Sequence, residues 1–378
     1  MGKVRMTLLK GILSGVIIAA AIPPTMYWGL GYATAASTSA LHSVNEMAGR
    51  LTQSMNNRTG TIVFNYEGKT SNLKSQIQAA LDQAMSSDPY LHYIIGSYGF
   101  SYRGSTRSAK VTVEIKYLET LQQTNFVSQE VKAALKEIIK PGMNSHEKVK
   151  AIHDWVVLTL QYDTSYRKYT AYEGLKTGSA VCQGYALLSY KMLKEAGIPN
   201  QIVEGTARPE GGRSQSHAWN LVQLDGRWYH LDTTWDDPSP DQAGVVQTGY
   251  YLRTDSQMAV DHYWVRNYPA ASVPYYQTLS ELVKRGGDKT AYYEALQKEL
   301  HYVLYDEDRV ITSASGIMTL AEKAADSGET GITFRYRGSK TSLISDLQQL
   351  YDLGFDHLSY QSSVFENTGD LKVSVSWD

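Results

Sequence analysis

The pattern of apolar and polar positions predicts a small mixed unit near the N-terminus. Residues 60–66 alternate as a strand does, and a helix that begins near Ser71 has one apolar face (Leu73, Ile77, Ala80, Leu81, Ala84). Two further strands follow near 93–102 and 110–117, the second with strict alternation. A weaker helical pattern starts at about Ser39. The predicted element order is therefore α-β-α-β-β.

The same pattern returns near the C-terminus with an offset of 270 residues. The offset relates strand and helix positions in the two copies (Phe64 and Phe334, Tyr66 and Tyr336, Gly68 and Gly338, Leu73 and Leu343, Ile77 and Leu347). The preceding helices keep it as well (Met47 and Ile317, Leu51 and Ala321, Met55 and Ala325). We therefore expect two related domains, 36–120 and, with a helical connector, 281–378, each a sheet covered by helices on one face.

The intervening segment, 121–280, has a different pattern. One helix is predicted from Ser128 and ends at Pro141-Gly142, and a second is predicted from Ser145. A tyrosine-rich loop follows (Tyr162, Tyr166, Tyr169, Tyr172). It leads to Cys182, which precedes apolar positions at helical spacing (Ala186, Tyr190, Leu193). Cys182 is thus expected at a helix N-terminus, where the helix dipole favours a thiolate over a thiol.

A β-hairpin is predicted after this helix. The strand 216–224 is followed by Asp225-Gly226, a strong two-residue turn signal, and by a returning strand, 227–232. If Leu224 pairs with Arg227, then positions 217, 219, 232 and 234 share one face of the sheet. His217 and Asp232 would be diagonal neighbours on that face. A slip of one residue would separate them.

Composition and charge restrict the class of protein. With 42% apolar and 20% charged residues, the chain has the composition of a globular protein of two or three domains. A net charge of −2 gives no basic surface for nucleic acid. One cysteine excludes an internal disulfide, so the thiol is either a small core residue or a reactive group.

The N-terminus predicts export. Basic residues (Lys3, Arg5, Lys10) precede the apolar run 11–22, and Ala33-Thr34-Ala35 offers small residues for cleavage. We therefore expect residues 1–35 to be a signal peptide. The alternative is an uncleaved anchor, lengthened by apolar residues up to Leu30. Both interpretations place the rest of the chain outside the cytoplasm, secreted or at the cell surface.

A thiol at a helix start, a histidine on a strand and a carboxylate on the next strand are the parts of a nucleophile, base and orienting acid. We assign these roles to Cys182, His217 and Asp232. His230 is the alternative base, but it lies close to the acid in sequence and is expected to bond locally. The sequence has no His-Glu-x-x-His, Cys-x-x-Cys or Gly-x-Ser-x-Gly motif for zinc, redox or serine chemistry.

Three blocks of sequence around these residues resemble the catalytic blocks of the transglutaminase-like superfamily. They are Gly178-Ser179-Ala180-Val181-Cys182-Gln183-Gly184-Tyr185-Ala186, Ser216-His217-Ala218-Trp219-Asn220 and Trp228-Tyr229-His230-Leu231-Asp232-Thr233-Thr234-Trp235-Asp236. The resemblance covers roughly 146–269, with His153-Asp154-Trp155 before the site and Asp261-His262-Tyr263-Trp264 after it. It implies an α+β, papain-like fold and matches Cys182, His217 and Asp232 to the family's catalytic triad.

Other residues near these blocks are expected to bind substrate or to form walls of the site. These expected substrate-binding or wall residues are Tyr162, Gln183, Trp219 and Trp235. Trp219 could close over an acyl intermediate. Some transglutaminases use calcium, and an acidic group follows the triad (Asp236, Asp237, Asp241). A solvated loop is the favoured interpretation, because no EF-hand spacing is present. No other cofactor is expected.

The sequence leaves three functions open. The first is an exported thiol-dependent acyl transfer on protein carboxamides, which crosslinks with an amine or deamidates with water. The second is a cysteine peptidase of the same fold. The third is a noncatalytic cell-surface module whose repeats bind a polymer or protein. The expected partners are protein or peptide substrates at the cell wall or surface, with membrane contact only through an uncleaved N-terminal segment.

Overall fold

The computed structural model describes residues 3–4, 39–209, 211–366 and 368–377, which form two compact units, Met1–Ser272 and Val273–Asp378. Apart from Lys3 and Val4, the predicted signal peptide or anchor lies outside the described residues. Among the described helices, none is both long and apolar enough to cross a bilayer.

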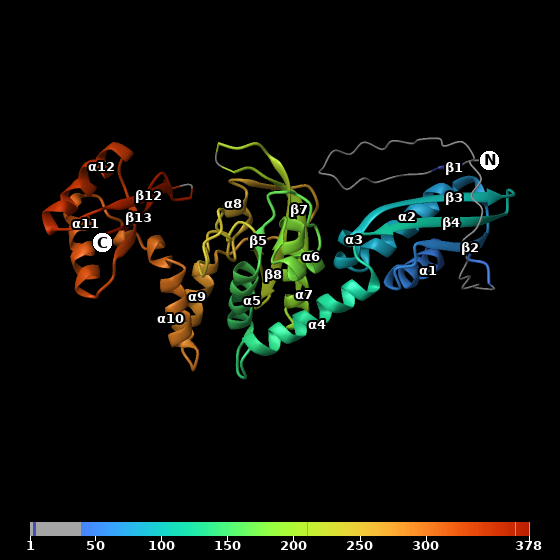
Figure 1. The fold of residues 1–378 in the computed structure, drawn as a ribbon, viewed down its shortest axis with the longest axis horizontal. Coiled ribbons are helices and arrows are strands. Elements are labelled where there is room, and N and C mark those ends of the chain that lie inside the picture. Colours follow the sequence, from blue (N-terminus) through green and yellow to red (C-terminus); the bar gives the residue numbers. More distant parts are fainter. Residues whose placement is uncertain (1–2, 5–38, 210, 367, 378) are drawn as a thin grey trace. The chain divides into compact units, whose positions relative to one another are not determined.

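The first part of unit 1 is a helix-covered sheet (Figure 1). Its elements are α1 (Val44–Asn56), β2 (Thr61–Glu67), α2 (Leu73–Ser86), α3 (Pro89–Ile94), β3 (Ile95–Gly104) and β4 (Ser108–Tyr117). The antiparallel sheet has the order β1-β3-β4-β2, where β1 is Lys3–Val4. Alternate residues of β2 and β4 are buried together with one face of each of the two longer helices, as the sequence pattern predicts.

The second part of unit 1 places helices beside a four-stranded antiparallel sheet (Figure 1). Its helices are α4 (Leu121–Ile138), α5 (Ser145–Thr159), α6 (Ala171–Thr177), α7 (Cys182–Glu195) and α8 (Asp255–Met258). The main sheet has the order β10-β7-β8-β9, from His262–Trp264, Asn200–Ala207, Gln215–Leu224 and Arg227–Leu231. Two short strands, β5 (Gln161–Tyr162) and β6 (Ser179–Ala180), pair in parallel just before α7.

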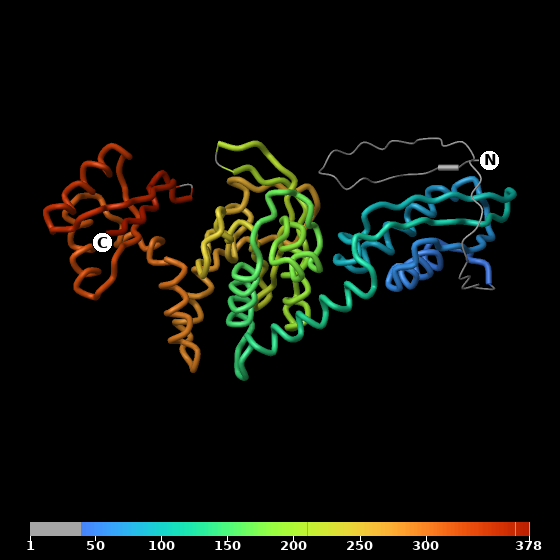
Figure 2. Tube along the Cα trace, viewed as in Figure 1, coloured from blue at the N-terminus to red at the C-terminus, as the bar shows by residue number. Residues whose placement is uncertain are grey.

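Unit 2 begins with two helices, α9 (Tyr275–Arg285) and α10 (Thr290–Glu299), and then repeats the fold of the N-terminal part. The chain can be followed in Figure 2 through α11 (Ala314–Asp326), β11 (Gly331–Tyr336), α12 (Lys340–Gln348), β12 (Ser359–Val364) and β13 (Leu371–Ser376). Short 3₁₀ turns lie at Tyr302–Tyr305, Glu307–Arg309 and Gln349–Leu353. The sheet order β11-β13-β12 is that of β2-β4-β3.

The two copies also share a side-chain detail. Tyr66 donates to Gln76 over 2.9 Å, and Tyr336 donates to Asp346 over 2.7 Å. A Cβ added at Gly68 would lie 2.5 Å from the hydroxyl oxygen of Tyr66, and one added at Gly338 would lie 2.5 Å from the ring of Tyr336, so a side chain at either position would displace the tyrosine. The matching glycines in the sequence therefore reflect a tyrosine that folds back over the chain in both copies.

Local signals shift several predicted boundaries. The helix predicted from Ser128 begins at Leu121, because Thr120 and Gln123 form a capping box. The predicted tyrosine loop contains α6, which Thr170 and Glu173 cap in the same way. The 270-residue offset holds at Phe64 and Phe334 but falls to 262 at their strand partners, Val111 and Val373. The shortening lies before the hairpin, because the partners of these two residues on the preceding strand, Tyr102 and Ser362, are already only 260 positions apart.

Candidate active site

Cys182 is the first residue of α7, as the sequence predicts. The helix is buried along most of its length, and Val181 at its N-cap provides no side-chain cap. A Cβ added at Gly184 would lie 2.5 Å from the Cβ of Ala180, so this glycine allows the first turn to pack against β6. The thiol is partly exposed, and the helix start that carries it is fixed by packing.

His217 and Asp232 meet as the hairpin register predicts. Leu224 pairs with Arg227, and the turn residues Asp225 and Gly226 have φ values of 49° and 79°. The ladder ends at Leu231, so Asp232 lies one residue beyond the strand. Its Oδ2 is 2.6 Å from Nε2 of His217. The register is confirmed, and the chain beyond it completes the approach.

Backbone groups hold the carboxylate of Asp232. Its Oδ1 accepts hydrogen bonds from the backbone N–H groups of Thr234 (3.0 Å) and Trp235 (3.3 Å). The side chain has no exposed surface. Burial alone would raise the pKa of Asp232, but the charge and hydrogen bond of His217 outweigh burial and hold the pKa well below its ordinary value. Asp232 is therefore a fixed buried anion.

His217 links this anion to the thiol. Nε2 bonds to Asp232, which leaves Nδ1 for the hydrogen bond between His217 and Cys182. Burial would lower the pKa of His217, but the charges of Asp232 and Cys182 outweigh it and raise the pKa to about 10. The imidazole is therefore protonated near neutral pH. This is the electrostatic arrangement that stabilises a thiolate.

His262 is a fourth member of the cluster, and it had no assigned role from the sequence. β10 pairs with β7 at the edge of the sheet and places Nε2 of His262 3.1 Å from Oδ2 of Asp232. Nδ1 of His262 lies 2.5 Å from Asp261. In the sequence, the block Asp261-His262-Tyr263-Trp264 carries only the resemblance to the superfamily. Its distance from Asp232 in sequence hides the contact.

A cleft of about 420 Å³ opens beside His217. Tyr162, Trp235 and Asp237 line it, as do Tyr166 and Thr234. Its size falls within the usual range for small-ligand sites. Of the predicted wall residues, Tyr162 and Trp235 therefore face the open space beside the histidine.

The other two predicted wall residues are held by the protein. Trp219 is 1% exposed, stacks on His217 with centroids 5.7 Å apart, and donates to Nδ1 of His230 over 2.8 Å. It therefore supports the imidazole of His217 from the protein side. The side-chain amide of Gln183 donates to the backbone carbonyl of Tyr93 over 3.0 Å. Gln183 thus ties the start of α7 to the N-terminal part of unit 1.

His230, the alternative base, faces different partners. Its Nδ1 accepts from Trp219, and its Nε2 lies 2.9 Å from Asp255. Burial lowers its pKa. Its ring nitrogens are thus engaged by Trp219 and Asp255, and His217 is the histidine that lies between the thiol and Asp232.

The acidic group considered for calcium does not converge on one point. Asp236 bonds to His153, Asp237 accepts from Tyr185, and Asp241 accepts from Gln161. Within the described part of the chain, the one cluster with atoms close enough to share a metal ion is His217, Asp232 and His262, all within 4.8 Å. Their contacts have the lengths of direct hydrogen bonds, so we describe them as a hydrogen-bonded network.

The buried helix that carries the thiol and the strand that carries the histidine define a papain-like fold of the cysteine-dependent class. Residues 132–233 match the model of the transglutaminase-like superfamily. The expected fold is thereby confirmed. Members of the superfamily are often cysteine-dependent acyltransferases or peptidases, so the match supports a cysteine-dependent enzyme as the class of this domain.

Two curated relatives are similar to this region. Kyphoscoliosis peptidase of mouse is 27% identical over 158 residues, which cover 36% of this chain and 24% of that protein. The human protein of the same name is 30% identical over 125 residues, covering 30% and 18%. The aligned regions thus span a quarter or less of these relatives. A solved TGase structure has 15% identity and a TM-score of 0.26, covering 46% of this chain and 50% of that one.

Proposed function

We propose that this chain is a thiol-dependent acyltransferase that acts on protein carboxamides outside the cytoplasm. The observation that carries the proposal is the continuous contact from Cys182 through His217 to Asp232, with a cleft beside the histidine. A buried histidine, held by a carboxylate and facing a partly exposed thiol, is the arrangement that activates a sulfur nucleophile.

In the first half-reaction, the Cys182 thiolate attacks the carbonyl carbon of a glutamine side chain. A C–S bond forms, and the carbonyl π electrons move to oxygen. When the tetrahedral intermediate collapses, the C–N bond breaks and the imidazolium of His217 gives its proton to the leaving nitrogen, which departs as ammonia. A thioester on Cys182 remains, and His217 is neutral.

In the second half-reaction, neutral His217 takes a proton from the acceptor as the acceptor attacks the thioester. The C–S bond breaks, and thiolate and imidazolium are restored. A lysine amine as acceptor gives an isopeptide crosslink, whereas water gives a carboxylate. Asp232 holds the imidazole so that Nδ1 faces sulfur in both steps.

The start of α7 supports the negative charge that develops on the carbonyl oxygen. The first N–H groups of a helix have no acceptor within the helix, and they point outward at its N-terminus. Cys182 is the first helical residue, so these groups lie beside the reacting sulfur. Backbone donors of this kind stabilise an oxyanion without reorganising.

The test is the incorporation of a fluorescent primary amine into a glutamine-containing protein. We expect incorporation with the full-length protein and its loss, by about 10⁴-fold or more, in Cys182→Ala. Equal incorporation by the two proteins would refute acyl transfer through this thiol. Cys182→Ala is a suitable variant because it removes one partly exposed sulfur atom, and its melting temperature can be compared with that of the unmodified chain.

A cysteine peptidase is the second candidate, because two relatives of the domain carry the name peptidase. The same steps then break a main-chain amide, and water resolves the thioester. Peptide cleavage that depends on Cys182 but not on added amine would favour this candidate. If neither reaction occurs and Cys182 labels no faster than a simple thiol, the domain is a noncatalytic module.

Export is a separate proposal that depends on the basic and apolar pattern of residues 3–35. Its test is the location and the N-terminal sequence of the mature protein. A protein that begins near residue 36 in the medium or at the cell surface indicates a cleaved signal peptide. A full-length protein in the membrane fraction indicates an anchor, and a full-length protein in the cytoplasm would overturn the proposal.

A further inference from the structure

His262 contacts the same carboxylate oxygen of Asp232 as the cleft-lining His217, and the two imidazole rings lie edge to face with centroids 5.2 Å apart. Oδ2 of Asp232 lies 2.6 Å from Nε2 of His217 and 3.1 Å from Nε2 of His262. The two imidazoles therefore share one carboxylate oxygen. His262 is 2% exposed, and Asp232 has no exposed surface, so this shared contact is shielded from water.

The second ring nitrogen of His262 also faces a carboxylate. Nδ1 lies 2.5 Å from Oδ1 of Asp261, whose Oδ2 accepts a hydrogen bond from Tyr250 over 2.6 Å. An ionised carboxylate only accepts hydrogen bonds, so each of these contacts needs a proton on the imidazole nitrogen. Two such contacts fit a doubly protonated, cationic ring. His262 is therefore placed to act as a fixed counter-ion of Asp232.

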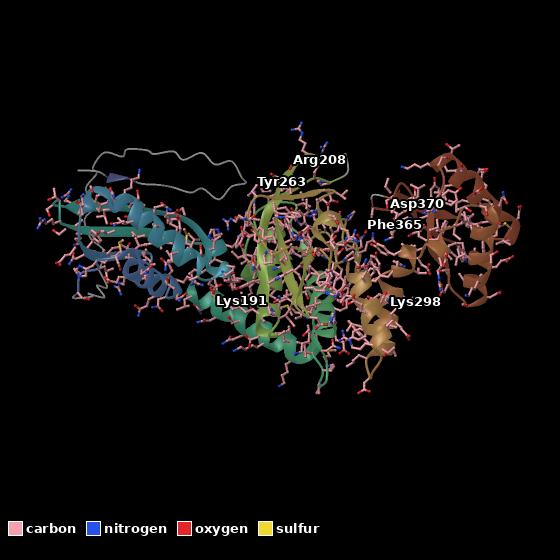
Figure 3. All side chains as sticks on the ribbon, turned by 180° about the vertical axis from the view of Figure 1, so that it is seen from behind. Lys191, Arg208, Tyr263, Lys298, Phe365 and Asp370 are labelled. Atoms are coloured by element: carbon pink, nitrogen blue, oxygen red, sulfur yellow. The ribbon has the colours of Figure 1, made fainter. Side chains whose placement is uncertain are left out.

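Aromatic rings hold His262 in this position. The ring centroids of Trp235, Trp219 and Tyr250 lie 4.5, 5.0 and 5.3 Å from its own. The strand β10 fixes the backbone through its pairing with Ala207, and Figure 3 shows Arg208 and Tyr263 at this end of the sheet. Because the ring is packed on several sides, it has little freedom to leave Asp232.

We propose that His262, held by Asp261, is a positioning residue that keeps Asp232 ionised and turned toward His217. This inference rests on the proposed function of the triad and extends it by one residue pair. His262 acts through Asp232 and touches neither sulfur nor the cleft. It supplies a charged hydrogen bond to the buried carboxylate of Asp232. Without this bond, less of the free-energy cost of burying that charge would be offset.

The expected consequence of losing His262 has a definite sign. The titratable groups that face it are Asp232, Asp261, His217, His230 and Tyr250. Without the cation, protonation of buried Asp232 becomes easier, and His217 loses its counter-ion at a higher pH than before. The thiolate that His217 stabilises is then lost at a higher pH as well.

A matched control lies in the same unit. His153 is also buried between two carboxylates, with Nδ1 2.8 Å from Asp154 and Nε2 3.0 Å from Asp236. Neither carboxylate bonds to His217. His153→Gln therefore removes a histidine of the same type and burial without removing a donor to Asp232.

The experiment measures how fast iodoacetamide alkylates Cys182 between pH 4 and 9, using intact mass of the full-length protein. Cys182 is the only thiol, so every adduct reports on it. For His262→Gln we expect the acid limb of the rate profile to move up by roughly one pH unit, because Asp232 loses a charged hydrogen bond. His153→Gln should leave the limb in place. Near neutral pH, kcat for amine incorporation should fall about 10- to 100-fold in His262→Gln with little change in KM.

The outcomes separate this inference from the proposed function. If His262→Gln keeps the profile and kcat of the unmodified chain, the positioning role is refuted. If His262→Gln and His153→Gln lose melting temperature and labelling rate equally, the role of His262 is merely structural and the inference also fails. If the unmodified protein labels no faster than a simple thiol, it is the triad's function that fails. His262→Asn, a shorter amide, provides a second variant if His262→Gln does not fold.

Discussion

Two buried histidines in unit 1 have the same surroundings and different consequences. His217 and His153 are both nearly inaccessible to solvent, both bond to a fully buried aspartate, and both have a raised pKa. In each case burial would lower the pKa, and the neighbouring carboxylates outweigh it. The direction of the pKa shift therefore does not tell the two sites apart.

The difference lies in what occupies the second nitrogen. In His153 it faces Asp154, which also pairs with Lys150 over 2.6 Å, so the network ends in a structural ion pair. In His217 it faces the thiol of Cys182, and the residue borders a cleft. A perturbed pKa therefore marks a buried charge network. Such a network is a candidate active site only where it also contacts a nucleophile and opens to solvent.

Replacing His217 should have the largest effect on chemistry. His217→Gln retains a polar side chain but cannot carry the proton between sulfur and the leaving group. We expect amine incorporation to fall by about 10⁵-fold or more, and alkylation of Cys182 near pH 7 to fall at least about tenfold. The check is a rate measurement on folded protein of verified circular dichroism. Unchanged alkylation would mean that His217 does not activate the thiol.

Replacing Asp232 should have the next largest effect. Asp232→Asn retains the shape of the side chain but removes the charge that His217 and His262 share, so kcat should fall by about 10³–10⁴-fold. The natural comparison is Asp236→Asn, which makes the same change beside His153. Its activity per folded molecule should stay within about threefold of the unmodified chain, and a loss as large as that of Asp232→Asn would abolish the contrast between the two networks.

The pKa shifts of His217 and Asp232 predict how the stability of the protein depends on pH, and Asp232→Asn tests this dependence. The pKa of His217 is raised from 6.5 to about 10, so its contribution to the free energy of unfolding is complete below about pH 6.5 and is lost as the pH rises toward 10. Because the pKa of Asp232 is lowered in the folded protein, this residue contributes to the free energy of unfolding above about pH 3.8, and the contribution is lost on acidification. The free energy of unfolding measured in urea should therefore fall between pH 6.5 and 10, and it should fall less in Asp232→Asn. Parallel pH curves for the two proteins would contradict the assignment.

Replacing His153 should affect stability alone. His153→Gln leaves Asp236 buried with a neutral partner, which should cost about 1–3 kcal/mol of the free energy of unfolding. Cleft and thiol are untouched, so kcat per folded molecule should stay within about twofold. Thermal unfolding and amine incorporation on the same sample provide the test. Loss of activity without loss of stability would show that the second network also serves the reaction.

Metal removal should have the smallest effect. The carboxylates of Asp236, Asp237 and Asp241 bond to separate side chains, and the contacts of Asp232 with the two histidines are direct hydrogen bonds. Dialysis against EDTA should therefore change the alkylation rate of Cys182 by less than about twofold, and added calcium should not restore or raise it. A larger change would indicate an ion within one of the networks.

Some features of the site could be predicted because their signals are local. The apolar spacing after Cys182 indicated a helix start, and Asp225-Gly226 indicated a turn that fixed the register of the hairpin. That register placed His217 near Asp232, and the two are bonded. The capping boxes at Thr120 and Thr170 are equally local signals, and they mark the true start of α4 and the presence of α6 in the predicted loop.

The sequence by itself therefore determined the repeated α-β-α-β-β units, the helix that carries the thiol and the hairpin beneath it, because helix periodicity, strand alternation and turn chemistry act over a few residues. Only the tertiary structure decided that Trp219 stacks on His217 and that His262 bonds to Asp232 from 30 positions away. Those contacts depend on how β10 pairs with β7 and on which side chains are buried when the chain folds. Such pairing joins distant segments, and no local pattern along the chain records it.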